Sequence, residues 1–494
     1  MFTKILIANR GEIAVRIIRT CREMGILTVA VYEISDRQSL HVRLADEAVR
    51  LPSHHSFMEP EWMLDVARQV GADAVHPGYG FLAEDADFIR ACEAAGITFI
   101  GPPAEVVDAT RSKIGALEAV RAAGMPTVDH SPRSFAEDEF DALRAEADRL
   151  GYPLVVKSCR GGRGRGERLV DRPGQLAEIV RRSQVEAQAV YGNKQLYLER
   201  AILPAHQVGV QIVADKHGAL VELGEREGSI IHNNQKIVEE SPALCISDEQ
   251  RPALLAAAVR IARLFNYQNL GTVEFLVDEA GDFYFSEIKS RIQIEHTMTE
   301  MITRIDLVRE QIRLAAGEPL GYVQEAIDRR GWAIMCRVQA EDPFRRYLPS
   351  PGHLRRVRLP GGPEVRVDTY LYCGADVPTF YDPIIAKVTV WAAERAAAID
   401  RMRRALEDFT IIGAPTNLPL LLQLMRVPAF VEGNYTTEIL QRPLDEIEPA
   451  ESETTRRDLA AAMAVLQARH HESFVPQQSE LTTSGWHRAS RRVR

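Results

Sequence analysis

The chain has 494 residues, of which 46% are hydrophobic and 26% charged, enough for about two to four domains with ordinary buried cores. The formal net charge of -9 argues against nucleic acid or an anionic membrane surface as the main partner, because either would favour a basic face. The six cysteines show no CxxC spacing, which indicates neither a zinc site nor a disulfide framework and makes the cytoplasm the expected compartment.

We expect the segment from Lys4 to about Pro102 to form a parallel sheet covered by helices. Apolar runs alternate there with amphipathic stretches such as 13–24, as in βαβ units; the runs are 5–8, 28–32, 74–76 and 98–100. Neither a secretion leader nor a run of about twenty apolar residues is visible, so we expect neither export nor a membrane span.

The middle of the chain predicts a helix, a glycine-rich turn and two hairpins. A helix is expected at 112–123, followed by a strand at 154–157, a turn at 161–166 and a returning strand at 169–170. The antiparallel hairpins are predicted at 208–214 with 219–223, and at 272–277 with 282–288.

The C-terminal part predicts a third domain and a tail. Beyond about Gly331, turn signals at 349–352 and 360–363 separate short strands, and a helix is expected at 393–409. From about Leu444 an acidic stretch, one helical pattern at 456–469 and a basic end suggest an appendage that docks a partner.

The glycine-rich turn is a candidate phosphate lid. Gly161, Gly162, Gly164 and Gly166 let backbone amides approach phosphate oxygens, although an exposed turn would explain the same glycines. Four basic residues nearby favour the binding of an anion, because an uncompensated cluster of positive charges would repel itself; they are Lys157, Arg160, Arg163 and Arg165. A GxGxxG turn is absent, which argues against a dehydrogenase.

The second hairpin is a candidate metal site. Its four-residue turn brings Glu274 opposite Glu287, and facing carboxylates are destabilising unless a cation lies between them. Magnesium with nucleotide phosphates fits this arrangement, whereas two solvated strand carboxylates are the alternative. Lys289, Arg291 and Glu295 follow closely and make the segment unusually charged.

From about Lys4 to about Leu440 the sequence resembles the biotin carboxylase family. The motifs that carry the resemblance are IANRGEIA at 7–14, HPGYGFL at 76–82, QKIVEE at 235–240 and RIQIEH at 291–296, with Tyr381, Asp382 and Lys387. The resemblance implies an α/β and α+β chain with the ATP-grasp fold, a doubly wound parallel sheet at the N-terminus and a mixed α+β domain at the C-terminus. The boundaries it implies are 1–112, 113–330 with a flexible lid at about 130–203, 331–443, and a tail at 444–494.

The resemblance also implies a reaction: bicarbonate is phosphorylated by ATP, and biotin is then carboxylated. Glu295 resembles the general base, in a cradle for bicarbonate formed by Lys236, Arg291, Gln293, Ile294 and Glu295. Arg337 resembles the residue that stabilises the biotin enolate, and Tyr79 and Gly80 would line the biotin site. Lys236 and Arg291 are counted with Glu295 and Arg337 as catalytic.

The nucleotide contacts form a larger set. The implied ATP-binding residues are Lys113, Lys157, Gly162, Gly164, Arg165, Gly166, Glu199, Ile202, Asn234, Leu276, Glu274 and Glu287. Glu274 and Glu287 would hold magnesium. Lys289 stands where the family has a neutral asparagine, so we expect one magnesium ion rather than two, unless Lys289 turns outward to a surface carboxylate.

Several positions depart from the family pattern near ATP and the metal. Arg160 and Arg163 replace lid glycines, Glu167 replaces a methionine, and the segments 232–234 and 204–209 are altered. The bicarbonate and biotin residues are spared. The favoured interpretation is an active biotin carboxylase; the alternatives are a non-catalytic, regulatory subunit with impaired ATP use and an ATP-grasp ligase with another acceptor.

The expected partners follow from the same resemblance. No Met-Lys-Met acceptor is present, so biotin should arrive on a biotin carboxyl carrier protein, with carboxyltransferase subunits that choose a final acceptor the sequence does not reveal. A homodimer is expected through the first and third domains, and the matching interface positions are Arg16, Arg19, Glu23 and Arg366.

Overall fold

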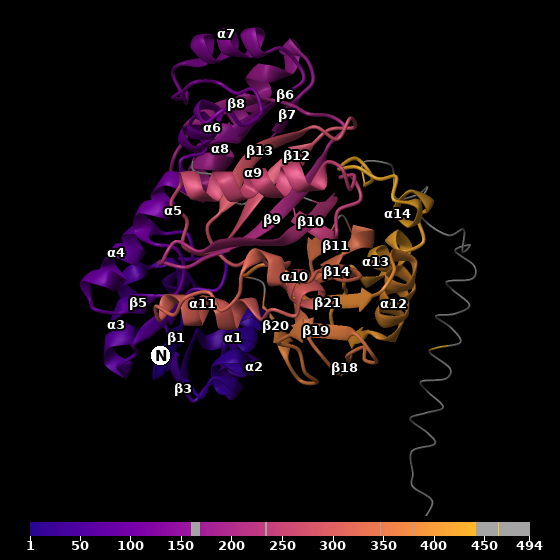
Figure 1. Ribbon diagram of the computed structural model, residues 1–494. Coiled ribbons are helices and arrows are strands. Elements are labelled where there is room, and N and C mark those ends of the chain that lie inside the picture. The colour runs from indigo at the N-terminus through magenta and orange to yellow at the C-terminus, as the bar shows by residue number, and fades with distance from the viewer. Residues whose placement is uncertain (160–167, 233–234, 346, 379, 441–462, 464–494) are drawn as a thin grey trace, which may run out of the picture. The chain divides into compact units, whose positions relative to one another are not determined.

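The computed structural model describes residues 1–159, 168–232, 235–345, 347–378, 380–440 and Met463 (Figure 1). Contacts divide the chain into two compact units, Met1–Arg442 and Pro443–Arg494. Apart from Met463, the tail helix predicted at 456–469 lies outside the described residues. Among the described residues, no helix is both long enough and apolar enough to cross a membrane.

The first sheet is parallel, as predicted, and has the strand order β3-β2-β1-β4-β5. Its strands are β1 (Lys4–Ile7), β2 (Leu27–Tyr32), β3 (Glu47–Arg50), β4 (Ala74–His76) and β5 (Thr98–Phe99). The accompanying helices are α1 (Gly11–Glu23), α2 (Leu40–Leu44), α3 (Pro60–Val70), α4 (Ala86–Ala94) and α5 (Ala104–Arg111). The order reverses between β1 and β4, and ligands bind outside the carboxyl ends of strands at such a switch point.

The loop after β4 is fixed at this switch point. Asn9, which follows β1, donates from Nδ2 to the carbonyls of Pro77 at 2.7 Å and Tyr79 at 2.9 Å. Gly78 has a φ of +63°, and a Cβ there would lie 3.0 Å from Asn9 Nδ2. The close approach therefore requires glycine. It holds Tyr79 and Gly80 beside the carboxyl end of β4.

The second sheet is antiparallel and has the order β13-β12-β9-β10-β11-β14-β21-β19. Its strands are β9 (His206–Ala214), β10 (Leu220–His232), β11 (Gln235–Ser241), β12 (Asn269–Val277), β13 (Phe283–Lys289), β14 (Trp332–Gln339), β19 (Val365–Thr369) and β21 (Ile384–Ala392). Both predicted hairpins are confirmed as β9–β10 and β12–β13. The sheet continues through the pairing of Val238 with Cys336, so it spans the boundary that the sequence places at 330/331.

A small three-stranded sheet carries the predicted lid. It consists of β6 (Leu154–Ser158), β7 (Arg168–Val170) and β8 (Leu196–Arg200), packed with α7 (Phe140–Leu150) and α8 (Leu176–Tyr191). β6 and β7 are antiparallel, which confirms a strand on each side of the glycine-rich turn. The turn itself, 160–167, lies outside the described residues.

The remaining helices cover the large sheet. α6 (Lys113–Ala122) and α9 (Arg251–Leu264) share a core with one face of β9 and β12, whereas α10 (His296–Thr303) and α11 (Leu307–Ala315) follow the β12–β13 hairpin (Figure 1). α12 (Arg395–Asp408), α13 (Leu418–Leu424) and α14 (Pro428–Glu432) complete the C-terminal part. The short strands there are β15 (Glu341–Asp342), β16 (Leu348–Pro349), β17 (Gly352–His353), β18 (Arg356–Arg358), β20 (Asp376–Val377) and β22 (Thr410–Ile412).

Candidate active site

Glu295 lies between two cations. It precedes α10, is 4% exposed, and places Oε1 3.5 Å from Lys236 Nζ and Oε2 3.1 Å from Arg337 Nη2. Burial raises the pKa of Glu295, but Lys236, Arg337 and Arg226 lower it further and hold it well below its ordinary value. Glu295 is therefore a buried carboxylate that stays ionised, as a base acting on a weak acid requires.

Lys236 on β11 lies among three carboxylates. Its Nζ is 3.3 Å from Glu274, 3.5 Å from Glu295 and 3.8 Å from Glu239. Burial lowers the pKa of Lys236, but these carboxylates raise it above its ordinary value. The ammonium is thus fixed as a positive charge within reach of both the proposed base and the proposed metal carboxylates.

Gln293 is held by a buried arginine that the sequence analysis missed. Arg226 on β10 is 2% exposed and donates to Gln293 Oε1 at 2.8 Å. It also donates to Gln211 at 2.8 Å, Thr299 at 2.7 Å and Thr272 at 3.0 Å. The Gln293 amide in turn donates to Glu274 Oε1 at 2.7 Å, so its orientation is fixed.

The carbonyl of Ile294 accepts a hydrogen bond from Lys387 Nζ at 3.1 Å. Lys387 on β21 is fully buried and forms an ion pair with Glu12 Oε2, also at 3.1 Å. Tyr79 donates its hydroxyl to the other oxygen of Glu12. One buried pair, Lys387 and Glu12, therefore connects the segment predicted to bind bicarbonate with the loop predicted to line the biotin site.

Arg337 on β14 and Arg291 have different partners. Arg337 is 6% exposed and donates to Glu239 Oε2 at 2.6 Å as well as to Glu295. Arg291 donates from Nε to Glu84 Oε2 at 3.1 Å. Glu84 was missed by the sequence analysis, although it lies two residues after the 76–82 motif and is a carboxylate beside a predicted ligand loop.

The predicted pairing of Glu274 with Glu287 is confirmed in the β12–β13 register. Glu287 contacts Lys289 Nζ at 2.7 Å and also contacts Lys113. Burial raises the pKa of Glu274, but Lys236 and Lys289 bring it down to about 2. The carboxylates of Glu274 and Glu287 face each other across the two strands and supply oxygen ligands that fit magnesium.

Lys289 turns toward this carboxylate pair. Its side chain is 12% exposed and forms an ion pair with Glu287, a residue of the proposed metal site and not a surface carboxylate. Strand alternation explains the direction, because residues two apart share one face. This geometry agrees with the expectation that an ammonium occupies space near the metal.

The predicted adenine-side residues gather near β8. Lys157 Nζ lies 2.8 Å from Glu199 Oε2, and Tyr197 donates to the other oxygen at 2.7 Å. Ile202 and Leu276 pack against the hydrophobic core that contains Tyr197. The remaining predicted ATP contacts lie outside the described residues; they are Gly162, Gly164, Arg165, Gly166 and Asn234.

Known protein families match most of the chain. Residues 1–107 match the biotin carboxylase N-terminal domain, 112–323 match the ATP binding domain of the carbamoyl-phosphate synthase L chain, and 335–442 match the biotin carboxylase C-terminal domain. The chain is 44% identical to a biotin carboxylase of Nostoc sp. over 89% of this chain and 99% of the relative. It is 41% identical to the 2-oxoglutarate carboxylase small subunit of Hydrogenobacter thermophilus over 95% of this chain and 100% of the relative.

Solved structures of biotin carboxylases are similar to this chain over most of its length. The biotin carboxylase domain dimer of the Hydrogenobacter thermophilus 2-oxoglutarate carboxylase, solved with MgADP, ADP and bicarbonate, matches with a TM-score of 0.88 and 42% identity over 91% of this chain and 100% of that chain. A biotin carboxylase–β-γ-ATP complex from Campylobacter jejuni matches with a TM-score of 0.86 and 36% identity over 90% of this chain and 99% of that chain.

Proposed function

The chain belongs to the biotin carboxylase family, and on this premise we propose that it uses ATP and bicarbonate to carboxylate biotin carried by another protein. The observation that carries the proposal is Glu295, a buried and ionised carboxylate with Lys236 at 3.5 Å and Arg337 at 3.1 Å. Glu295 as the base, Lys236 as the cation that would bind bicarbonate, and Arg337 as the cation that would face the biotin enolate thus lie together.

We propose that Glu295 removes the proton of bicarbonate, so that a bicarbonate oxygen can attack the terminal phosphate of ATP; ADP leaves and carboxyphosphate is formed. Lys236, Gln293 and the backbone at Ile294 would orient the anion, and Arg291 would turn from Glu84 to complete the cradle. Magnesium held by Glu274 and Glu287 would supply neutralisation of the phosphate charge. Lys113 and Lys157, which are paired with Glu287 and Glu199 in the structure, would contact the phosphates once these carboxylates release them.

In the second half of the reaction, carboxyphosphate would break down to CO2 and phosphate, the phosphate would take the N–H proton of biotin, and Arg337 would stabilise the biotin enolate that attacks CO2. A guanidinium keeps its charge at any working pH, so it can face a developing anion without reorganisation. Tyr79 and Gly80 would line the biotin site from the fixed loop after β4. A non-catalytic role is not favoured, because the groups around Glu295 are all present and positioned.

We propose that the chain works with a biotin carboxyl carrier protein and carboxyltransferase subunits, in the cytoplasm.

A homodimer is part of this proposal. Arg16 and Arg366 both bind Glu300 of their own chain, at 2.9 Å and 2.5 Å, whereas Arg19 and Glu23 are exposed on α1. Sedimentation at micromolar concentration should give a dimer, and Arg19→Glu should weaken it; a monomeric wild type would contradict the proposal.

The function is tested by transfer of labelled bicarbonate to free biotin in the presence of MgATP. The proposal expects acid-labile label in biotin, with one ADP released for each carboxyl group transferred. ATP cleavage that ignores both bicarbonate and biotin would favour a ligase with another acceptor, and a folded protein with no ATP cleavage would favour a regulatory subunit.

A further inference from the structure

Buried carboxylates on β10 and β11 have arginine partners at almost every position. The pairs are Glu222 with Arg329 at 2.8 Å, Glu239 with Arg337 at 2.6 Å, Glu240 with Arg395 at 2.7 Å, and Glu225 with Arg251. Such pairing is expected, because a buried charge needs either a counter-ion or a bound metal. Glu227 is the exception on these strands.

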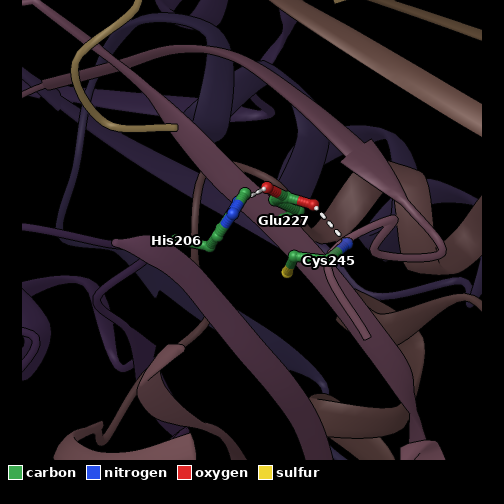
Figure 2. Close-up of side chains that lie close together, drawn as sticks. All are labelled: His206, Glu227 and Cys245. Atoms are coloured by element: carbon green, nitrogen blue, oxygen red, sulfur yellow. Dashed lines mark hydrogen bonds and ion pairs between the residues drawn. The ribbon is translucent and has the colours of Figure 1, made fainter. Parts of the chain in front are cut away.

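Glu227 is 1% exposed and forms no ion pair with an arginine of the part of the chain that the structure describes. Among the residues that the structure describes, His206 is the one basic side chain that pairs with it, through Nδ1 at 2.7 Å (Figure 2). The other donors to Glu227 are neutral: Ser229 Oγ at 2.9 Å and the backbone amides of Leu244 at 3.1 Å and Cys245 at 3.4 Å. These donors fix the orientation of the carboxylate but add no positive charge.

Cys245 completes a group of three metal-ligating side chains. A ring nitrogen of His206, a carboxylate oxygen of Glu227 and the sulfur of Cys245 all lie within 4.8 Å of one another. Figure 2 shows the three residues lying close together, and the dashed line to Cys245 ends on its backbone nitrogen; they belong to β9, β10 and the loop that follows β11. His206 and Cys245 are partly exposed, so an ion can enter from solvent.

We propose that His206, Glu227 and Cys245 bind one divalent ion of the zinc class. Imidazole, thiolate and carboxylate are the ligands that zinc takes, at about 2.0 to 2.3 Å, which places tetrahedral ligand atoms about 3.5 Å apart. The ligand atoms now lie within 4.8 Å of one another, so they would have to approach one another by about 1 Å to reach that geometry. Binding releases the thiol proton of Cys245, and water fills the fourth position.

The site is separate from the proposed catalytic centre. Val208, next to His206 on the same face of β9, packs into the core with α9, whereas Gln211 on the opposite face binds Arg226 of the catalytic centre. Neighbouring residues of β10 divide in the same way, with Arg226 toward the catalytic centre and Glu227 toward the proposed ion. The ion would therefore cross-link β9, β10 and the loop before α9, on the face of β9 opposite to Gln211 and Arg226.

Cobalt(II) is a suitable probe because a thiolate ligand gives it a sulfur-to-metal absorption band that oxygen ligands do not. The full-length protein, freed of metal with a chelator, should bind one cobalt ion with this band and lose it when one equivalent of zinc is added. Cys245→Ser should abolish the band, and His206→Gln should weaken cobalt binding at least about tenfold. Cys373→Ser is the matched control, since Cys373 is an exposed thiol elsewhere.

Nucleotide binding and circular dichroism establish that each variant is folded, and zinc should raise the melting temperature of the wild type and Cys373→Ser but not of Cys245→Ser. Three results overturn the proposal: no sulfur-to-cobalt band in the wild type, a band that persists in Cys245→Ser, or loss of the band in Cys373→Ser. Cobalt bound at Glu274 and Glu287 cannot imitate the expected result, because that site has no sulfur.

Discussion

Arg337 Nη2 lies 3.1 Å from Glu295 Oε2, so the proposed base of the first half-reaction is paired with the proposed enolate-stabilising cation of the second. The same nitrogen also donates to Glu239 at 2.6 Å. Two buried carboxylates thus share one guanidinium. This arrangement keeps Glu295 ionised before bicarbonate binds, and it leaves Arg337 positioned for biotin.

Arg337→Lys should separate the two half-reactions. Lysine keeps the charge but cannot present a guanidinium fork to two carboxylates and biotin together. We expect biotin carboxylation to fall at least about 100-fold, the usual loss for one stabilising donor, while bicarbonate-dependent ATP cleavage without biotin falls much less. Parallel assays of ADP release and of label in biotin measure both. Equal losses in the two assays would show that Arg337 has no special role toward biotin.

Lys289→Asn should change the magnesium requirement. The ammonium of Lys289 lies 2.7 Å from Glu287, where a second magnesium ion would otherwise bind. Two positive charges a few ångströms apart at an effective dielectric near 20 repel by about 4 kcal/mol, so the ammonium disfavours that second ion. We therefore expect the wild type to saturate as MgATP, with no benefit from excess free magnesium. The asparagine variant should acquire such a benefit, measured as ATPase rate against free magnesium at fixed MgATP.

Lys194→Asn is the control for Lys289→Asn, because Lys194 forms an exposed ion pair with Glu137 far from the proposed metal carboxylates in sequence. It should respond to magnesium as the wild type does. Identical magnesium curves for Lys289→Asn and the wild type would mean that the lysine does not stand in for a metal ion.

Glu12→Gln should reduce the pH dependence of stability. Burial is the largest cause that raises the pKa of Glu12 from 4.5 to about 7, against the lowering effect of Lys387. The folded protein therefore holds a proton on Glu12 between these values when the unfolded chain has lost it, and stability falls as the pH rises through this window. This contribution is about 3 kcal/mol.

Denaturant unfolding at pH 4.5, 6 and 8 measures this effect. The free energy of unfolding should decline more steeply with pH in the wild type than in Glu12→Gln. Glu23→Gln, whose side chain is 67% exposed, should follow the wild type. If Glu12→Gln keeps the full slope of the wild type, Glu12 is not the titrating group.

The local pattern of the sequence was enough to predict the elements that carry the site. Alternation and turn length predicted both hairpins and the pairing of Glu274 with Glu287, because these depend on neighbours in the chain. The roles of Glu295, Arg337 and Lys236 came from the family resemblance, and they stay predictions that the geometry supports.

The partners of those residues could not be predicted from local pattern. Glu84 meets Arg291 across 207 positions, and Lys387 reaches Ile294 across 93. His206 and Glu227 are 21 positions apart on adjacent strands and come together only in the folded chain. The absence of CxxC spacing concerns cysteines that are close in sequence, so it could not reveal that Cys245 lies beside these two residues. Side-chain contacts of this kind depend on the tertiary fold, which periodicity does not determine.

The most direct test of the account is bicarbonate-dependent ATP cleavage in the wild type and in Glu295→Gln, with MgATP affinity measured on the same samples. Glutamine keeps the size of the side chain and removes the base, so the account predicts a loss of at least about 100-fold in bicarbonate-dependent cleavage, with MgATP affinity changed by no more than a few-fold. Full turnover by Glu295→Gln would contradict the central claim that this carboxylate activates bicarbonate.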